Sequence, residues 1–145
     1  MNIQILETDI DTAAGVSILI PELIDPHSAE EYHRRMDGKT FLSLIAYADG
    51  KPAGFKIGYD KFGDGSFYSW MGGVLPAYRG NHIAKALAER QENWVKAQGF
   101  SSITFKTRNR HRAMLLFAIS NGFSIISVEP GKSIDEYRIM LRKSL

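Results

Sequence analysis

The sequence predicts a mixed α/β fold in one domain, and three observations support this. The chain has 145 residues, of which 44% are hydrophobic and 23% are charged, and such a chain is long and apolar enough to bury a single core. Runs with the alternation of strands interchange with runs that have helical spacing. Two strand-helix-strand passages in the second half favour parallel neighbours in a sheet. We find no linker and no internal repeat, so one domain is expected over residues 1–145.

The first part of the chain predicts a strand and two helices, over residues 2–7, 12–20 and 29–36. The strand alternates apolar and polar side chains. Asp9 or Asp11 can cap the first helix, and Pro21 ends it. The second helix is short and polar, and Ser28 and Glu31 have the spacing of a capping box at its start.

Three strand-like runs follow, over residues 40–48, 53–62 and 66–75. The segments between them, Asp-Gly-Lys-Pro at 49–52 and Gly-Asp-Gly at 63–65, have the composition of turns. Because both connections are short, neighbouring strands must run in opposite directions. The sequence therefore predicts an antiparallel meander.

The last part of the chain predicts two helices, over 83–98 and 112–120, and three strands, over 101–107, 123–129 and 136–145. The first of these helices ends at Gly99. Its inward face is formed by residues with helical spacing, namely Ile83, Leu87, Gln91, Trp94 and Val95. The second helix is ended by the Asn121-Gly122 pair.

Charge and composition exclude several classes of function. The formal net charge of +2 is too small to demand a nucleic acid, and it is compatible with an anionic ligand. Cysteine is absent, which excludes disulfides, thiolate catalysis and cysteine-based zinc sites. His27 and His33 do not have a recognisable metal spacing, so no metal is expected. Without a signal peptide or an 18-residue apolar stretch, we expect a cytoplasmic protein that does not bind membranes.

The stretch "VLPAYRGNHIAKAL", residues 74–87, joins a strand to a helix and has the character of an anion site. The strand ends at Pro76 and the helix begins near Asn81, so several N-terminal amides of the helix have no intrahelical partner and attract phosphate. Small and basic side chains surround these amides, namely Arg79, Gly80, Ala84 and Lys85. The alternative is a packing junction without a ligand, because Arg-Gly pairs also precede such helices.

This stretch resembles the signature of the GNAT superfamily of acetyl-CoA-dependent N-acetyltransferases. The signature is Val-x-Pro at the end of the fourth strand, followed by Arg/Gln-x-x-Gly-x-Gly/Ala, and it is matched here by Val74, Pro76, Tyr78, Arg79, Gly80, Ile83, Ala84 and Leu87. His82 departs from it, because the family usually has its middle glycine there. Residues 48–59 resemble the family's hairpin between its second and third strands, and the Asn-Gly-Phe of 121–123 resembles its usual Leu-Gly-Phe.

The resemblance implies a GNAT-like fold with about seven strands in a mixed sheet, splayed between strands 4 and 5, and about four helices. Acetyl-CoA would place its pyrophosphate on the amides of residues 79–85 and its pantetheine in the splay. Gly72-Gly73 would form a bulge, and the amide of Gly73 or Val74 would polarise the thioester carbonyl. Without the resemblance, these glycines could simply let a neighbouring side chain pack. The cofactor-binding residues implied are Val74, Arg79, Gly80, Asn81, His82, Ile83, Ala84, Lys85, Asn109 and His111.

The family's usual proton donor is missing. Many members have an asparagine that binds pantetheine and, seven residues later, a tyrosine that protonates the leaving thiolate. Counting back from the Gly-Phe pair places Ala118 at the tyrosine position and His111 at the asparagine position, although Asn109 can supply the asparagine contact. Tyr137 and Tyr59 are candidates for the hydroxyl, with core packing as the alternative for both. His111 is a further candidate donor, with a solvated loop histidine as the alternative.

The resemblance implies acetyl transfer to a primary amine of a small molecule or peptide by direct attack, since the chain has no cysteine and no convincing nucleophile-base pair. Tyr59 and Trp70 are expected to line an acceptor pocket that could receive an apolar or cationic amine. Glu31 and Asp60 are the nearest candidates for a general base, and exposed carboxylates are the alternative reading of both.

Three other hypotheses remain at this point. Because Ala118 replaces the usual acid, the chain could be a non-catalytic acetyl-CoA-binding or sensing module. The basic cluster at residues 106–112 could form a nucleic-acid patch, but it lacks interleaved aromatic residues, so a solvated loop suffices and no nucleic acid is expected. Members of the family are often dimers, so the resemblance also allows a homodimer.

Overall fold

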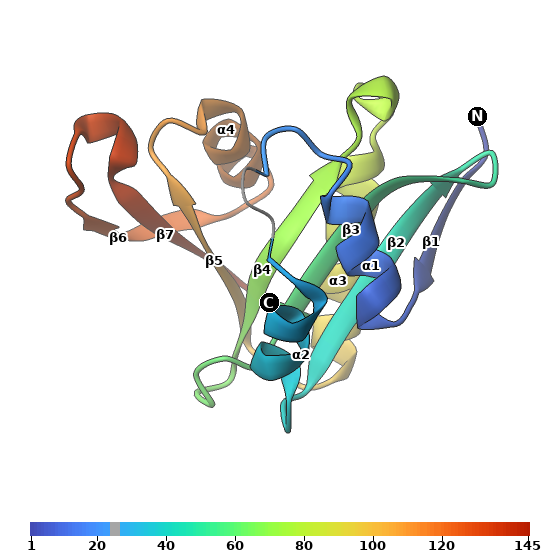
Figure 1. Ribbon diagram of the computed structural model, residues 1–145. Helices are drawn as coiled ribbons and strands as arrows, with labels where there is room; N and C mark the ends of the chain where they lie inside the picture. The colour runs from blue at the N-terminus through green and yellow to red at the C-terminus, as the bar shows by residue number, and fades with distance from the viewer. Residues whose placement is uncertain (24–26) are drawn as a thin grey trace.

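A seven-stranded mixed sheet, with strand order β1-β2-β3-β4-β5-β7-β6, forms the centre of the molecule (Figure 1). The computed structural model describes residues 1–23 and 27–145. The strands are β1 (Ile3–Glu7), β2 (Phe41–Ala48), β3 (Lys51–Tyr59), β4 (Ser66–Val74), β5 (Ser102–Arg108), β6 (Ser124–Glu129) and β7 (Arg138–Ser144). The helices are α1 (Ile10–Ser17), α2 (Ala29–Met36), α3 (Ile83–Ala97) and α4 (Arg112–Ser120), with two short 3₁₀ turns, η1 (Pro76–Tyr78) and η2 (Ile134–Glu136).

Both of the first two helices have a cap that the sequence predicts, but α1 spans Ile10–Ser17 and therefore begins two residues before, and ends three residues before, the predicted range of 12–20. Asp9 caps α1, because its Oδ1 accepts a hydrogen bond of 2.7 Å from the backbone N–H of Thr12. Ser28 caps α2 by accepting from the N–H of Glu31 at 3.2 Å. The Glu31 carboxylate, however, accepts from arginine side chains one turn further on. It is therefore engaged within the helix itself, by i,i+3 and i,i+4 pairs.

The meander of β2, β3 and β4 is antiparallel, as predicted. The turn between β2 and β3 is tighter than expected, because Asp49 and Gly50 both have positive φ, 49° and 81°. Two residues with positive φ are typical of a hairpin turn whose twist matches that of its strands. Strand β3 consequently starts at Lys51, two residues before the predicted range.

Helices cover both faces of the sheet (Figure 1). Alternate residues of β3 explain this, since Phe55 and Ile57 pack with α1 and α2, whereas Gly54 approaches Leu87 of α3 on the other face. Helix α4 packs over β5 and β7, where Leu115 and Ala118 meet side chains of β7. The predicted fold class is thereby confirmed. Within the described residues, no helix has both the length and the apolar character needed to cross a membrane.

Candidate active site

Strands β4 and β5 separate halfway along their length. They are paired in parallel over three positions only, the last being Tyr68 opposite Thr104. Beyond it, β4 continues to Val74 and β5 to Arg108 without pairing to each other, and Figure 1 shows the two strands diverging. The predicted splay is therefore present. Because the strands are parallel, both carboxyl ends open at the same edge of the sheet.

The bulge of β4 lies at Trp70 and not at Gly72-Gly73, which corrects the expectation drawn from the resemblance. Met71 is opposite Ile57 and Ser69 is opposite Gly58, so Trp70 is the extra residue. Gly72 and Gly73 pair regularly with β3. A Cβ added to Gly73 would lie 2.8 Å from Cδ1 of Ile20, so this glycine lets a neighbouring side chain pack against the strand.

The register of β4 distinguishes the two candidate amides. The N–H of Leu75 donates to the carbonyl of Ala53 at 2.8 Å, toward β3. In an antiparallel pair, every second residue of a strand faces the same neighbour, so the N–H of Gly73 also faces β3. The N–H of Val74 therefore points the other way, into the space from which β5 has diverged. Val74 has the free amide of the pair.

The start of α3 presents a group of backbone amides at the same edge. The first hydrogen bond into the helix is from the N–H of Ala86 to the carbonyl of His82. Among the described residues, the N–H groups of residues 80–85 have no backbone acceptor, and this is the ordinary condition of a helix N-terminus. Gly80 has a φ of 80° and nothing within 4 Å of the Cβ it lacks. The space beside Gly80 is therefore open.

His82, which replaces the family's middle glycine, has a left-handed backbone with φ of 61° and ψ of 20°. A helix-start conformation would accommodate a side chain at this position, but His82 does not adopt one. This conformation explains why glycine is usual at the position, because a Cβ is disfavoured in the left-handed region. The imidazole is exposed, and within the described residues it makes no capping hydrogen bond that would offset the strain.

Arg79 is already paired. Its guanidinium donates to both carboxylate oxygens of Glu22, at 2.8 and 2.5 Å, and its Nε donates to the carbonyl of Val74 at 3.1 Å. The same pair lowers the pKa of the Glu22 carboxyl, chiefly through the hydrogen bonds from Arg79. Arg79 thus ties the end of β4 to the segment after α1. For the Arg79 guanidinium to contact an anion directly, as expected, it would have to leave Glu22. Asn81, Ala84 and Lys85, in contrast, are exposed at the start of α3.

The remaining predicted residues of the cofactor site lie at the end of β5. Asn109 donates its side-chain amide to the carbonyl of Ile134 at 3.2 Å, and its N–H donates to the carbonyl of Tyr137. His111 precedes α4, and burial, followed by repulsion from Arg110 and Arg108, lowers the pKa of its imidazole. A lowered pKa keeps His111 neutral at pH 7, so it is a poor proton donor there.

The two candidate bases, Glu31 and Asp60, have other partners, and the position of the family's acid is buried. Ala118, at the position of the family's tyrosine, is 2% exposed and faces the core under α4. Two arginines lower the pKa of the Glu31 carboxyl to about 2, chiefly through hydrogen bonds from Arg34 and then Arg35. The Asp60 carboxylate accepts from the N–H of Gly63 in a turn. Tyr137 is half-buried at the start of β7, at the same edge as Asn109.

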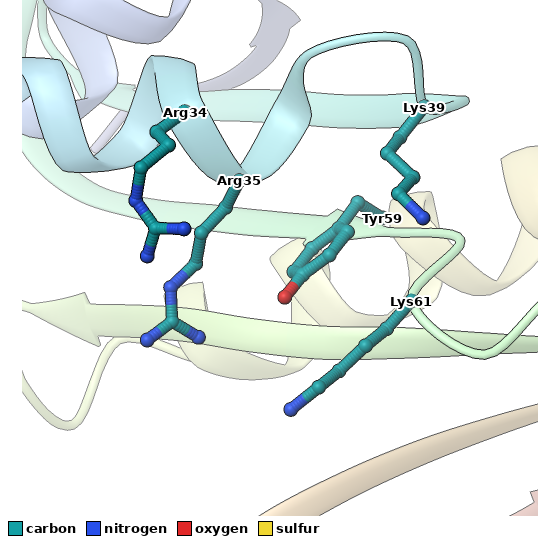
Figure 2. A pocket seen from close by; sticks show the side chains of 5 residues that line it. All are labelled: Arg34, Arg35, Lys39, Tyr59 and Lys61. Atoms are coloured by element: carbon teal, nitrogen blue, oxygen red, sulfur yellow. The ribbon is translucent and has the colours of Figure 1, made fainter.

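Tyr59 and Trp70 belong to an aromatic cluster on the side of the sheet covered by α2. Trp70 packs on Tyr32 with ring centroids 4.9 Å apart, and the guanidinium carbon of Arg35 lies 4.3 Å from its ring centroid. Tyr59 is buried, with its ring edge-on to Trp70 at 6.0 Å. It also lines a pocket whose other walls are basic side chains (Figure 2).

Three of the four lysine and arginine side chains in the basic cluster of residues 106–112 pair with two carboxylates. Lys106 lies 3.7 Å from Glu129. Arg108 and Arg110 both pair with Glu136. These pairs explain the cluster without a nucleic acid. Across residues 1–23 and 27–145, the side chains of histidine, aspartate and glutamate form no group of three that could hold a metal ion.

Lys56 is a residue that the sequence analysis missed. It lies opposite Gly72 in the register of β3 and β4, and a Cβ on Gly72 would be 3.5 Å from its Cγ. Burial lowers the pKa of its ammonium to about 8. The alternation of β3 could have identified it, because Lys56 lies on the same face of the strand as Gly54 and Gly58, and that face lies under α3.

Known structures with the same fold are N-acetyltransferases. The ribosomal-protein-S18-alanine N-acetyltransferase from Escherichia coli has a TM-score of 0.82 at 17% identity, covering 99% of this chain and 94% of that one. Ard1 from Thermoplasma volcanium has a TM-score of 0.83 at 16% identity, covering 100% and 99%. The PaiA N-acetyltransferase from Thermoplasma acidophilum, solved in complex with coenzyme A, has a TM-score of 0.75 at 17% identity, covering 100% of both chains.

The sequence itself carries the family assignment. The sequence model of the Acetyltransferase (GNAT) family matches residues 12–123, which includes the splayed strands, the start of α3 and all of α4. No curated protein matches the sequence. The chain belongs to the GNAT acetyltransferase family, and the resemblance noted from its signature is confirmed.

Proposed function

We propose that this protein transfers the acetyl group of acetyl-CoA to a primary amine of a small molecule or peptide by direct attack. The observation that carries the proposal is the edge where β4 and β5 separate. There, the amide of Val74 does not pair with β3, and the N–H groups of residues 80–85, at the start of the helix that follows β4, have no backbone acceptor among the described residues. Membership of the family and the coenzyme A complex of PaiA support the same assignment.

The residues present fit acetyl-CoA. Backbone amides at a helix N-terminus suit a pyrophosphate, and Gly80 leaves open space beside them. The two diverging strands offer unpaired backbone to an extended pantetheine arm. Asn109 and His111 follow the end of β5 and are available to contact the pantetheine arm. Lys85 adds a positive charge near the pyrophosphate, while Arg79 acts mainly by fixing the end of β4.

When bound, acetyl-CoA supplies a thioester whose carbonyl carbon accepts the amine, so that an N–C bond forms as the C–S bond breaks. The N–H of Val74 would polarise the carbonyl, because hydrogen bonds to developing negative charge stabilise a transition state. The amine must lose a proton and the leaving sulfur must gain one. Tyr137 lies beside the end of β5, where its carbonyl accepts from the N–H of Asn109 at 2.8 Å, and we assign its hydroxyl as the candidate donor.

The test is a thiol-release assay on the intact chain, with the variant Val74→Pro. Proline removes the N–H of Val74 and leaves in place the N–H groups of Gly73 and Leu75, which face β3. We expect kcat to fall about 100-fold to 1000-fold, the usual effect of deleting one oxyanion donor, with acetyl-CoA still binding. Val74→Ala keeps the amide and is the matched control, and circular dichroism verifies that both variants fold.

Two outcomes would contradict the proposal. If acetyl-CoA binds saturably but no amine releases thiol in a broad acceptor screen, the protein is the non-catalytic binding module that the buried Ala118 also permits. If acetyl-CoA does not bind, the edge of β4 and α3 is a packing junction. Equal rates for Val74→Pro and Val74→Ala would overturn the assigned amide alone.

A further inference from the structure

A basic pocket opens on the side of the sheet that carries α2 (Figure 2). Its volume is about 310 Å³, and it is lined by Arg34, Arg35, Lys39, Tyr59 and Lys61. The two arginines come from α2, Lys39 follows that helix, and Tyr59 and Lys61 lie at the end of β3. Four of the five lining side chains are cationic, and none is acidic.

The positive charge of this pocket is only partly balanced. Glu31 accepts from Arg34 at 2.6 Å and from Arg35 at 2.9 Å, so one carboxylate serves two guanidinium groups. Within the described chain, Lys39 and Lys61 have no carboxylate within 4.0 Å. The pocket therefore carries a surplus of positive charge that an anion would compensate.

Aromatic rings hold the cations in place. The Nζ of Lys61 lies 4.5 Å from the ring centroid of Tyr68, and Arg35 lies over Trp70. Burial lowers the pKa of Lys61, and repulsion from Lys106 and Arg35 lowers it further. The cationic side chains therefore repel one another within the pocket. A bound anion would reduce this repulsion.

The pocket adjoins the splayed strands. Tyr68 and Trp70 belong to β4 at the point where β5 leaves it, and Lys106 lies on β5 just past the last paired residue. Val74 follows Trp70 by four residues, which corresponds to roughly 10–13 Å along a strand. An acceptor whose amine lies at Val74 could therefore reach the basic pocket with a group about 10 Å from that amine.

We propose, on the basis of the proposed function, that the basic pocket binds the anionic end of the acceptor. The acceptor class is an extended amine that carries carboxylate or phosphate groups about 10 Å from its reactive nitrogen. This replaces the expectation of a cationic amine at Tyr59 and Trp70, because Arg35 already occupies the face of Trp70. A polyamine would add positive charge to a site that has a surplus.

The experiment compares four peptide amides that differ only in their last two residues: Ala-Ala-Ala followed by Glu-Glu, two phosphoserines, Gln-Gln or Lys-Lys. Three extended residues place the charged pair about 10 Å from the amine. With saturating acetyl-CoA, we expect the acidic peptides to have kcat/KM at least tenfold above Gln-Gln, and Lys-Lys to be poorest. The two acidic arms distinguish carboxylate from phosphate as the preferred group.

A charge-matched pair of double variants tests the pocket itself. Lys39→Gln with Lys61→Gln is expected to raise KM for the preferred acidic peptide about tenfold to thirtyfold, while the rate with Gln-Gln is unchanged. Lys51→Gln with Lys132→Gln removes the same charge from exposed positions elsewhere and is the control. Calorimetric titration of the acidic peptide without acetyl-CoA should show the same loss of affinity.

The outcomes separate this inference from the function on which it rests. Thiol release that is equal for the four peptides, or highest for Lys-Lys, overturns the anionic acceptor and leaves acetyl transfer standing. Equal losses in the two double variants show a general charge effect and also overturn it. Absence of thiol release with every peptide, together with calorimetric binding of the acidic ones, contradicts the proposed function but supports the pocket.

Discussion

At the scale of single residues, Lys56 is the most unusual position in the molecule. It carries a charge into the layer between β3 and α3 with no carboxylate within 4.0 Å among the described residues. Burial alone lowers the pKa of its ammonium from 10.5 to about 8. After allowance for the partial exposure of the side chain, such a shift means that the charged form of Lys56 lowers the free energy of unfolding by roughly 2–3 kcal/mol.

We predict that Lys56→Met stabilises the protein by about 2 kcal/mol at pH 7, measured by urea denaturation. The sign follows from the pKa. Between pH 8 and pH 10.5 the unfolded chain holds the proton and the folded chain releases it, so the parent gains stability as the pH rises. The destabilisation caused by the charged ammonium of Lys56 is complete below pH 8 and is absent above pH 10.5. The stability difference between variant and parent should shrink over that window.

Lys51→Met is the matched control, since Lys51 is exposed at the start of the same strand, and it should change stability by less than about 0.5 kcal/mol. A gain for Lys56→Met that is equally large at pH 7 and pH 11 would show that packing, and not desolvation of the charge, causes it.

Single residues also show the limit of the sequence. The signature positions from Val74 to Leu87 were identifiable, because their types are tied to local backbone geometry. Arg79, in contrast, was expected to face an anion and instead pairs with Glu22, 57 positions away in sequence. A partner that distant leaves no local pattern, and the same holds for the contact of Gly73 with Ile20.

At the scale of elements, the sequence predicted every strand and helix, because caps, turns and periodicity are local properties. Ser28 marks its helix start in sequence and in structure alike, and of the two caps that the sequence offers for α1, Asp9 and Asp11, the structure uses Asp9. The bulge at Trp70 could not be located, since it is defined by pairing with Ile57 and Gly58 on another strand. The two 3₁₀ turns were also missed, being three residues each and without periodicity.

Helix α4 provides a prediction about the missing acid. We expect Ala118→Tyr to destabilise the protein by about 1–3 kcal/mol, because Ala118 is 2% exposed among Leu115, Ile139 and Leu141, and overpacking a core is unfavourable. The new hydroxyl would enter that core rather than the splay, so amine-dependent thiol release should not rise. Thermal denaturation and the thiol assay measure both effects.

Ile119→Tyr is the control on the next position of the helix, where the side chain is 50% exposed, and it should be nearly neutral. A stable Ala118→Tyr protein with faster turnover and a new basic limb in its pH profile would contradict the prediction. It would mean that the helix can turn this position toward the splayed strands.

At the scale of the whole molecule, the sheet consists of two parts joined by a narrow connection. Strands β5 and β7 are paired at seven positions, whereas β4 and β5 are paired at three. The connection is reinforced by Phe67, which packs edge-on with Trp94 and Phe100, and by an ion pair of 2.9 Å between Lys143 and Glu92. All six residues of β6 are exposed at the outer edge.

This division predicts how the fold opens. Hydrogen exchange should be fastest in β6 and α4 and slowest in β2 and β3, because cooperative units with fewer buried contacts open at lower free energy. Acetyl-CoA would bridge the two parts, contacting residues 80–85 on one side and Asn109 on the other. It should therefore slow exchange in β5 and α4 as well as at its own contacts, and it should stabilise the whole by about 2.7 kcal/mol at 100 times its Kd.

The comparison that decides this is exchange measured with and without acetyl-CoA, analysed peptide by peptide by mass spectrometry. Protection confined to residues 79–85 would mean that the ligand binds the helix start without spanning the splay. Uniform protection of both parts in the free protein would mean that three paired positions and one aromatic cluster suffice to couple them. Either result would contradict the prediction that acetyl-CoA couples the two parts of the sheet by binding across the splay.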